Sequence, residues 1–126
     1  HGALASTVAH DSHNISAVGC DVQALCQAVN GVIDHQGGIA CFQRGHFDCL
    51  PLPVAGLMSD SDGDTVGHQY QHLNRIATQT MGSRLQAPFM TLSFMALLVI
   101  PELKLSDQGL FDSQCFTFKS LTEKDG

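Results

Sequence analysis

The 126-residue chain is predicted to adopt an α+β fold, in which a mixed or antiparallel sheet carries two main helices on one face. Two observations favour this class. Short apolar runs bounded by turn residues, which are typical of strands and hairpins, recur along the chain. Two amphipathic stretches of helical period are set among them without a strict alternation of strand and helix. We expect residues 1–120 to form one domain and residues 121–126 to be a frayed tail.

The N-terminal third is predicted to contain two strands followed by a helix. Residues 3–9 and 15–18 are small or apolar and partly β-branched, which favours two strands with a polar connection between them. Asp21 is the expected N-cap of the helix. After it, apolar residues recur at intervals of three and four: Val22, Leu25, Cys26, Val29, Val32 and Ile33. This spacing predicts that all six, Cys26 included, face the core.

The middle of the chain is predicted to form a hairpin and a second helix. Residues 39–42 and 47–50 flank a glycine-containing turn, which is a hairpin pattern. Pro51 has no amide hydrogen to donate, so the segment that follows the hairpin is expected at a sheet edge. The polar run 59–64 leads to a helix cap. The helix itself is marked by an apolar stripe that precedes Gly82: Val66, Tyr70, Leu73 and Ala77.

The C-terminal third is predicted to begin with a short helix and to end in strands. Pro88 suits the first turn of a helix, where its missing amide hydrogen costs nothing. Residues 103–105, 110–111 and 116–118 have strand patterns, and a polar turn separates the first two.

Composition and charge argue against several classes of partner and location. Six basic against twelve acidic residues give a net charge of −6, which disfavours binding to nucleic acid or to an anionic membrane. The longest uncharged apolar run, residues 88–101, is shorter than the roughly 20 residues of a membrane-spanning helix. Five cysteines cannot form a complete set of disulfides. We therefore expect a cytoplasmic protein whose cysteines are small buried hydrophobes.

The densest polar cluster lies between the two N-terminal strands. It consists of His10, Asp11, Ser12, His13 and Asn14. Imidazoles and a carboxylate can ligate a metal or transfer protons, and a serine near a histidine can be a nucleophile. A strand-linking turn, in which short polar side chains bond nearby backbone groups, needs the same residue types. Residue types alone leave these interpretations open.

Two further patterns resemble metal sites but lack a required residue. His68 and His72 have the spacing of half a zinc-protease motif, yet Gln69 stands where that motif has glutamate. The run 60–64 alternates aspartates like the start of a calcium loop, yet Thr65 occupies the position that requires glycine. We expect the two histidines to face solvent and the aspartates to form a solvated loop with a helix cap.

Four blocks of sequence, in order, carry a resemblance to a known family. They are residues 2–14 with 18–19, residues 37–38, residues 50–59, and residues 88–97 with 99–105 and 109–110. Together they span about residues 2–118 and resemble the C-terminal domain of bacterial adenine deaminases, which belong to the amidohydrolase superfamily.

This resemblance implies the chemistry of a larger protein. The whole enzyme would be a metal-dependent barrel hydrolase that converts adenine and water to hypoxanthine and ammonia, in purine salvage or adenine catabolism. Histidines and carboxylates of a barrel upstream of residue 1 would hold its manganese or iron, and the family's domain also begins before Gly2. Nothing in this chain matches those ligands, so we expect no catalytic or metal-ligating residue here. The implied partners are the barrel, adenine through the parent enzyme, and further copies in a homo-oligomer.

The resemblance also favours a functional role for the polar cluster. His10, Asp11, Ser12, His13 and Asn14 match a family signature, and we expect them to enclose substrate. The leading hypothesis is an auxiliary domain of an adenine deaminase, inactive alone. The alternative is a stand-alone binding or interaction module. A third hypothesis, an independent hydrolase using Ser12 with a neighbouring histidine, lacks the glycine-flanked elbow of such nucleophiles.

Overall fold

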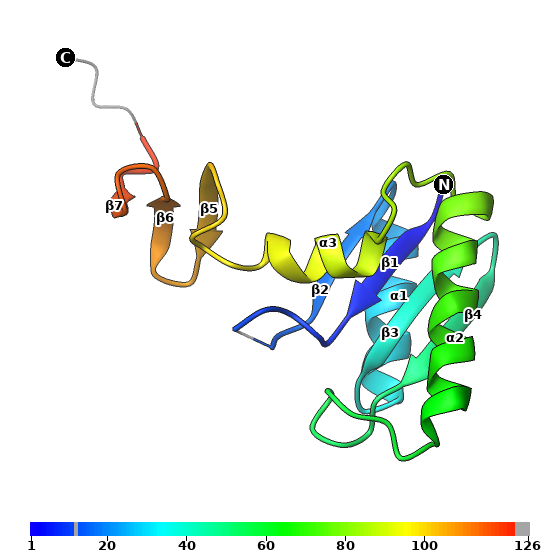
Figure 1. Cartoon of the computed structure of the whole chain (residues 1–126). Helices are drawn as coiled ribbons and strands as arrows, with labels where there is room; N and C mark the ends of the chain where they lie inside the picture. The colour runs from blue at the N-terminus through cyan, green and yellow to red at the C-terminus, as the bar shows by residue number, and fades with distance from the viewer. Residues whose placement is uncertain (12, 123–126) are drawn as a thin grey trace.

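The chain folds into two antiparallel sheets with helices, as the computed structural model shows for residues 1–11 and 13–122 (Figure 1). The first sheet has the strand order β2-β1-β3-β4, and the second has the order β5-β6-β7. The strands of the first sheet are β1 (Ala3–Ser6), β2 (Ser16–Gly19), β3 (Gly38–Gln43) and β4 (His46–Pro51). Those of the second are β5 (Leu103–Ser106), β6 (Gly109–Asp112) and β7 (Thr117–Lys119). The predicted α+β class with an antiparallel sheet is confirmed.

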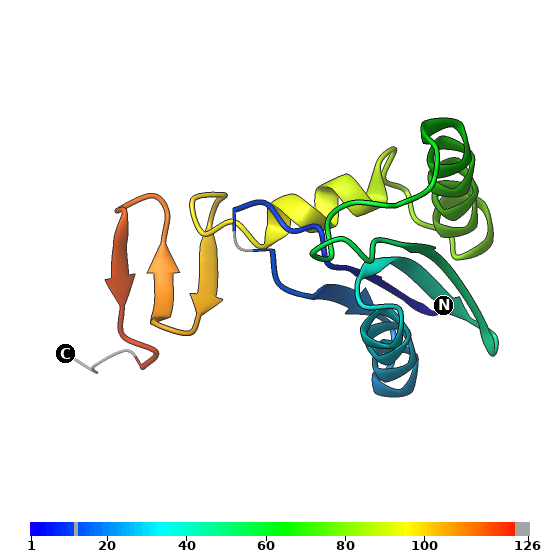
Figure 2. The same ribbon diagram turned by 90° about the horizontal axis from the view of Figure 1, so that it is seen from below.

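The helices differ from the expectation in their placement, because they lie on both faces of the first sheet (Figure 2). They are α1 (Val22–Asp34), α2 (Gly63–Arg75), the π-helical turn η1 (Ile76–Thr80) and α3 (Pro88–Met95). Helix α1 covers one face, and α2, η1 and α3 cover the other. The reason is visible in β1, where Ala3 and Ala5 contact α1 while Leu4 points to the α2 side. All four residues of β1 are buried, as expected of a strand in a sheet that is covered on both faces.

The contact between α1 and the sheet is made by small residues. Ala24 and Ala28 of the helix pack on Ala3, Ala5 and Ala40 of the strands, and all five are buried. Alanine pairs allow close approach of helix and sheet. Another close approach explains a glycine inside the helix, because a methyl group on Gly31 would collide with the ring of Phe47.

The predicted core face of α1 is therefore wrong in part. Ala24, Ala28 and Val32 are the buried residues, whereas Val22, Cys26 and Ile33 are exposed. Periodicity orders the residues around a helix, but the sheet contact is made by the stripe that permits the closest packing.

The predicted caps, turn and edge are confirmed. Asp21 accepts a hydrogen bond from the Ala24 amide at 2.7 Å, and Asp62 accepts one from the Thr65 amide at 3.0 Å. The β3–β4 turn places Gly45 at φ +81°, which glycine adopts without strain. Pro51 lies in β4, an edge strand. Pro88 begins α3, as predicted.

The second sheet lies apart from the first, beyond the C-terminal end of α3 (Figures 1 and 2). Its three strands confirm the predicted C-terminal strands. Phe111 is buried against the rings of Phe116 and Phe118, with centroids 5.3 Å away in both cases. The single domain over 1–120 and the frayed tail over 121–126 stay predictions, and residues 123–126 lie outside the described part. Within the described part, no helix is long and apolar enough to span a membrane.

Candidate functional site

The polar cluster lies on the loop between β1 and β2, and the start of this loop is firmly anchored. The Thr7 hydroxyl donates to the Gly56 carbonyl at 2.5 Å and accepts from the Gly38 amide at 2.9 Å. The Ser6 hydroxyl accepts from the Val8 amide at 3.0 Å. The Thr7 bonds connect the loop to two other segments of the chain, and the Ser6 bond is local, so the backbone at the start of the loop is held in place.

His10 is fixed by α3. Its amide donates to the Ser93 carbonyl at 3.0 Å, and its ring stacks on Phe94 with centroids 5.1 Å apart. Its Nδ1 atom lies 3.5 Å from the Asp11 carboxylate, an arrangement that orients an imidazole. The structure therefore brings together the predicted residues His10 and Asp11 with the ring of Phe94. The sequence analysis did not connect Phe94 to this site.

The turn itself projects polar groups outward. Asp11 has φ +64° and His13 has φ +38°, both in the left-handed region, and the His13 amide donates to the Ala9 carbonyl at 3.1 Å. His10, Asp11, His13 and Asn14 are all exposed, while Ser12 lies outside the described residues. The loop thus presents hydrogen-bonding side chains on a backbone held at its base. That arrangement can position a polar ligand carried by another surface.

The two metal-like patterns of the sequence do not gather further ligands among the described residues. Across residues 1–11 and 13–122, no three His, Cys, Asp or Glu side chains gather closely enough to hold a metal ion. His68 and His72 are exposed, as predicted, and His72 lies 3.6 Å from Asp48. Asp62 caps α2, and its hydrogen bonds from the Thr65 hydroxyl and amide lower the pKa of its carboxyl. The described residues therefore offer no ligand set for the manganese or iron that the resemblance implies.

The cysteines divide into two groups. Cys41 is buried and Cys49 is half-buried, and burial raises the pKa of these thiols to about 12 and about 11. They are inert core residues at neutral pH. The prediction of burial is wrong for Cys20, Cys26 and Cys115, which are exposed.

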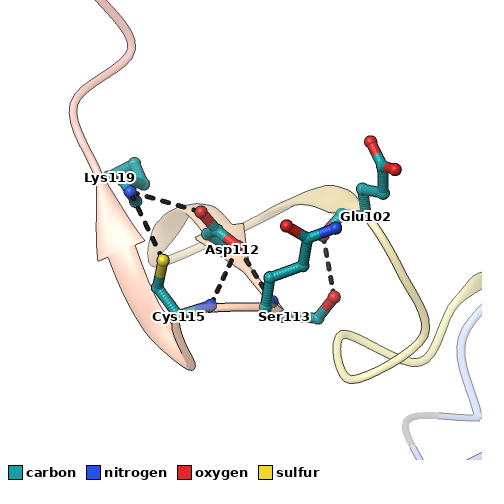
Figure 3. Close-up of polar contacts among 6 residues, drawn as sticks. Glu102, Asp112, Ser113, Cys115 and Lys119 are labelled. Carbon is teal, nitrogen blue, oxygen red and sulfur yellow. Dashed lines mark hydrogen bonds and ion pairs between the residues drawn. The ribbon is translucent and has the colours of Figure 1, made fainter.

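A polar cluster on the second sheet was missed by the sequence reasoning (Figure 3). Asp112 accepts from the amides of Gln114 and Cys115 at 2.9 and 3.1 Å, and Lys119 Nζ lies 3.2 Å from its carboxylate. The bond from the Cys115 amide is the main cause that lowers the pKa of Asp112. Ser113 donates to the Glu102 carbonyl at 2.9 Å. An aspartate followed by short polar residues is an Asx-turn signal, and this cluster closes the β6–β7 turn.

Two hollows flank α3. The larger, a cavity of about 420 Å³, lies between this helix and the edge strand β2, and its wall includes Leu4, Val18, Met81, Leu85, Leu92 and Met95. The smaller, about 210 Å³, lies on the α2 side and is lined in part by Val8, Ile39, Tyr70 and Phe89. Neither hollow gathers charged side chains. Sequence patterns gave no signal for them, because they arise between segments distant in the chain.

Comparison with known proteins shows the family of this chain. The family model described as the adenine deaminase C-terminal domain matches residues 1–117. The chain belongs to this family. It is 57% identical over 117 residues to the adenine deaminase of Sulfurovum sp. strain NBC37-1, covering 93% of this chain and 22% of that protein. The adenine deaminase of Salinibacter ruber is 56% identical over 117 residues (93% and 21%), and that of Methanosarcina barkeri is 52% identical over 120 residues (95% and 22%).

These matches confirm the family that the four sequence blocks indicated. The chain spans about a fifth of the length of the curated relatives it matches. The matching family model describes a C-terminal domain. Most of the length of each relative therefore lies outside the part that this chain matches.

Proposed function

We propose that this chain is the auxiliary C-terminal domain of an adenine deaminase, and that the domain is inactive alone. The supporting observation is that relatives named adenine deaminase match it over only about a fifth of their length, in the C-terminal domain family. The full-length protein would replace the amino group of adenine by the oxygen of water, which releases ammonia and leaves hypoxanthine. The rest of the protein, a catalytic barrel, would carry that reaction.

The metal belongs to the barrel in this proposal. A bound manganese or iron would supply the activated water of the deamination. The described residues of this chain offer no cluster suited to such an ion, so no step of the reaction is assigned to them.

The role of the β1–β2 loop is to enclose substrate at the mouth of the barrel. His10, Asp11, His13 and Asn14 are exposed polar residues on an anchored turn, and Ser12 joins them from the sequence alone. Buried hydrogen-bonding groups discriminate strongly, because an ill-fitting substrate leaves them unpaired. Against the edge of a purine, these side chains would favour adenine over bases with a different donor and acceptor pattern.

The proposal extends to the setting of the full-length protein. Five free thiols support a reducing, cytoplasmic compartment. Adenine as substrate places the reaction in purine salvage or adenine catabolism, and apolar side chains exposed on this domain support homo-oligomers of the whole enzyme.

A chimera tests the proposed function. In the Sulfurovum adenine deaminase, the 117 matched residues are replaced by the matching residues of this chain, and ammonia release from adenine is measured with added manganese. We expect the chimera to deaminate adenine, and this chain alone to release no ammonia. Turnover by the repurified chain alone would overturn the proposal. So would a folded, metal-loaded chimera without activity.

A further inference from the structure

The C-terminal half of α3 contacts the β1–β2 loop (Figure 2). Helix α3 ends at Met95, and the last carbonyls of a helix have no partner within the helix. The His10 amide donates to one of them, the Ser93 carbonyl, at 3.0 Å. The loop therefore supplies a hydrogen-bond partner at the end of α3, and the helix in turn fixes the backbone of His10.

Phe94 contacts the side chain of the same histidine. Its ring lies against the His10 imidazole with centroids 5.1 Å apart and planes inclined by 26°, which is a stacked arrangement. At the edge of the imidazole, Nδ1 lies 3.5 Å from the Asp11 carboxylate. The His10 side chain is nevertheless 46% exposed, and none of the described residues bonds to its Nε2. One face and one nitrogen of this imidazole are thus held, while Nε2 is available to a ligand.

The Phe94 ring contributes little to the core. It is 39% exposed, whereas Pro88 and Phe89 of the same helix are buried against the sheet. It also lies outside the linings of the two hollows that flank α3. Packing of the core therefore does not account for an aromatic ring at this position, and the contact with His10 does.

We propose that Phe94 is a positioning residue of the deaminase, which holds the His10 imidazole so that Nε2 forms a hydrogen bond with the edge of adenine. This inference rests on the proposed function, in which the loop encloses the substrate. An exposed histidine on a loop otherwise exchanges between rotamers, and each rotamer that turns Nε2 away from the base lowers the competent fraction of the enzyme. Stacking on Phe94 reduces that loss before the substrate arrives.

Three variants separate the flat ring of Phe94 from its apolar volume. Phe94→Leu keeps an apolar side chain and a good helix former but removes the ring. Phe94→Tyr keeps the ring and adds a hydroxyl group at a partly exposed position, so it is the conservative variant. Met95→Leu changes the next residue of the same helix, which is 44% exposed, and is the matched control.

Nuclear magnetic resonance of this chain tests the position of His10 without measuring activity. Protons above the face of an aromatic ring are shifted upfield, so the imidazole protons of His10 should be shifted upfield in the wild type and in Phe94→Tyr. In Phe94→Leu they should return to the values of an unstacked histidine. His35, whose ring centroid lies 5.5 Å from that of Phe47, should be unchanged in every variant and reports on general folding. Identical His10 signals in the wild type and Phe94→Leu would overturn the proposal.

The kinetics of the chimera test whether that position matters for the reaction. Phe94→Leu is expected to lower kcat/KM for adenine by about fivefold, from the typical strength of an aromatic pair, with metal content unchanged. Phe94→Tyr should retain most of the activity, and Met95→Leu should stay within about twofold of the wild type. A positioning residue acts through the residue it positions, so Phe94→Leu should cause no further loss in a His10→Ala background. An undiminished further loss there, or an equal loss in Phe94→Tyr, would overturn the proposal.

The outcomes distinguish this inference from the proposed function. An active chimera in which His10→Ala lowers kcat/KM and Phe94→Leu does not would overturn the positioning role and leave the proposed function standing. An active chimera that is indifferent to His10→Ala would do the same. A folded, metal-loaded chimera without activity would overturn the proposed function, and the role of Phe94 in deamination would fall with it even if the His10 signals show stacking.

Discussion

The two faces of the first sheet are packed in different ways. On one face, α1 meets the strands through alanines and a glycine, and the contact is close. On the other, α2, η1 and α3 pack through large residues such as Leu50, Leu73 and Phe89, and hollows flank α3. The difference teaches that the sheet is closely packed on the α1 face, whereas space is left beside α3 on the opposite face.

Removing volume should have its largest effect on the face with large residues. Leu73→Ala truncates a side chain that is buried in the core beneath α2. We expect the free energy of unfolding to fall by about 3 kcal/mol, since a cavity is added to the lost burial. Urea unfolding followed by circular dichroism measures it, and a loss below about 1 kcal/mol would show that this face adapts to missing volume.

Adding volume should destabilise the fold more on the α1 face than beside the larger hollow. Ala28→Leu places three extra carbons between α1 and the sheet, and we expect a loss of about 2 kcal/mol in the free energy of unfolding. Gln27→Leu, at the exposed neighbouring position, controls for helix propensity. Val18→Leu, at the open hollow, is expected to change stability by less than about 0.5 kcal/mol. Equal losses for Ala28→Leu and Val18→Leu would contradict the contrast between the faces.

A smaller effect is expected at the cap of α2. Hydrogen bonds from Thr65 lower the pKa of Asp62 below its ordinary value of 3.8, so the folded state favours the ionised carboxyl. This stabilisation is fully present above the unfolded-state pKa and is lost as pH falls through the lowered folded-state pKa. The stability difference between the wild type and Asp62→Ala should therefore be present at neutral pH and shrink in acid. Thermal unfolding across this pH range, with Asp60→Ala as the loop control, measures it. A stability difference that does not change with pH would show that the ionised carboxyl of Asp62 is not what stabilises the start of α2.

Local chemistry made much of the fold predictable. Asp21 and Pro88 were recognisable as helix starts, the polar run 59–64 as the lead into a helix cap, and Gly45 as a turn residue, because each acts on its immediate neighbours. The face on which α1 packs was not predictable in the same way. It depends on Ala28 fitting closely against strands that precede and follow the helix.

The candidate site shows the same limit. The polar run His10 to Asn14 stands out in the sequence, but its stacking on Phe94 joins segments that are far apart in the chain. The hollows beside α3 likewise arise from segments that meet only in the folded chain. The exposure of Cys26 was missed because a period cannot distinguish two adjoining stripes of one helix.

The most direct test of the central claim, that the β1–β2 loop serves a deaminase active site, is the adenine kinetics of the chimera with His13→Ala. We predict that kcat/KM falls by about tenfold or more, as the loss of a hydrogen bond worth about 1.4 kcal/mol would give, while metal content and thermal stability are unchanged. Ser12→Ala should act in the same direction, and His68→Ala, at an exposed histidine of α2, should have no effect. Normal deamination by both loop variants, or loss of metal from either, would contradict the claim.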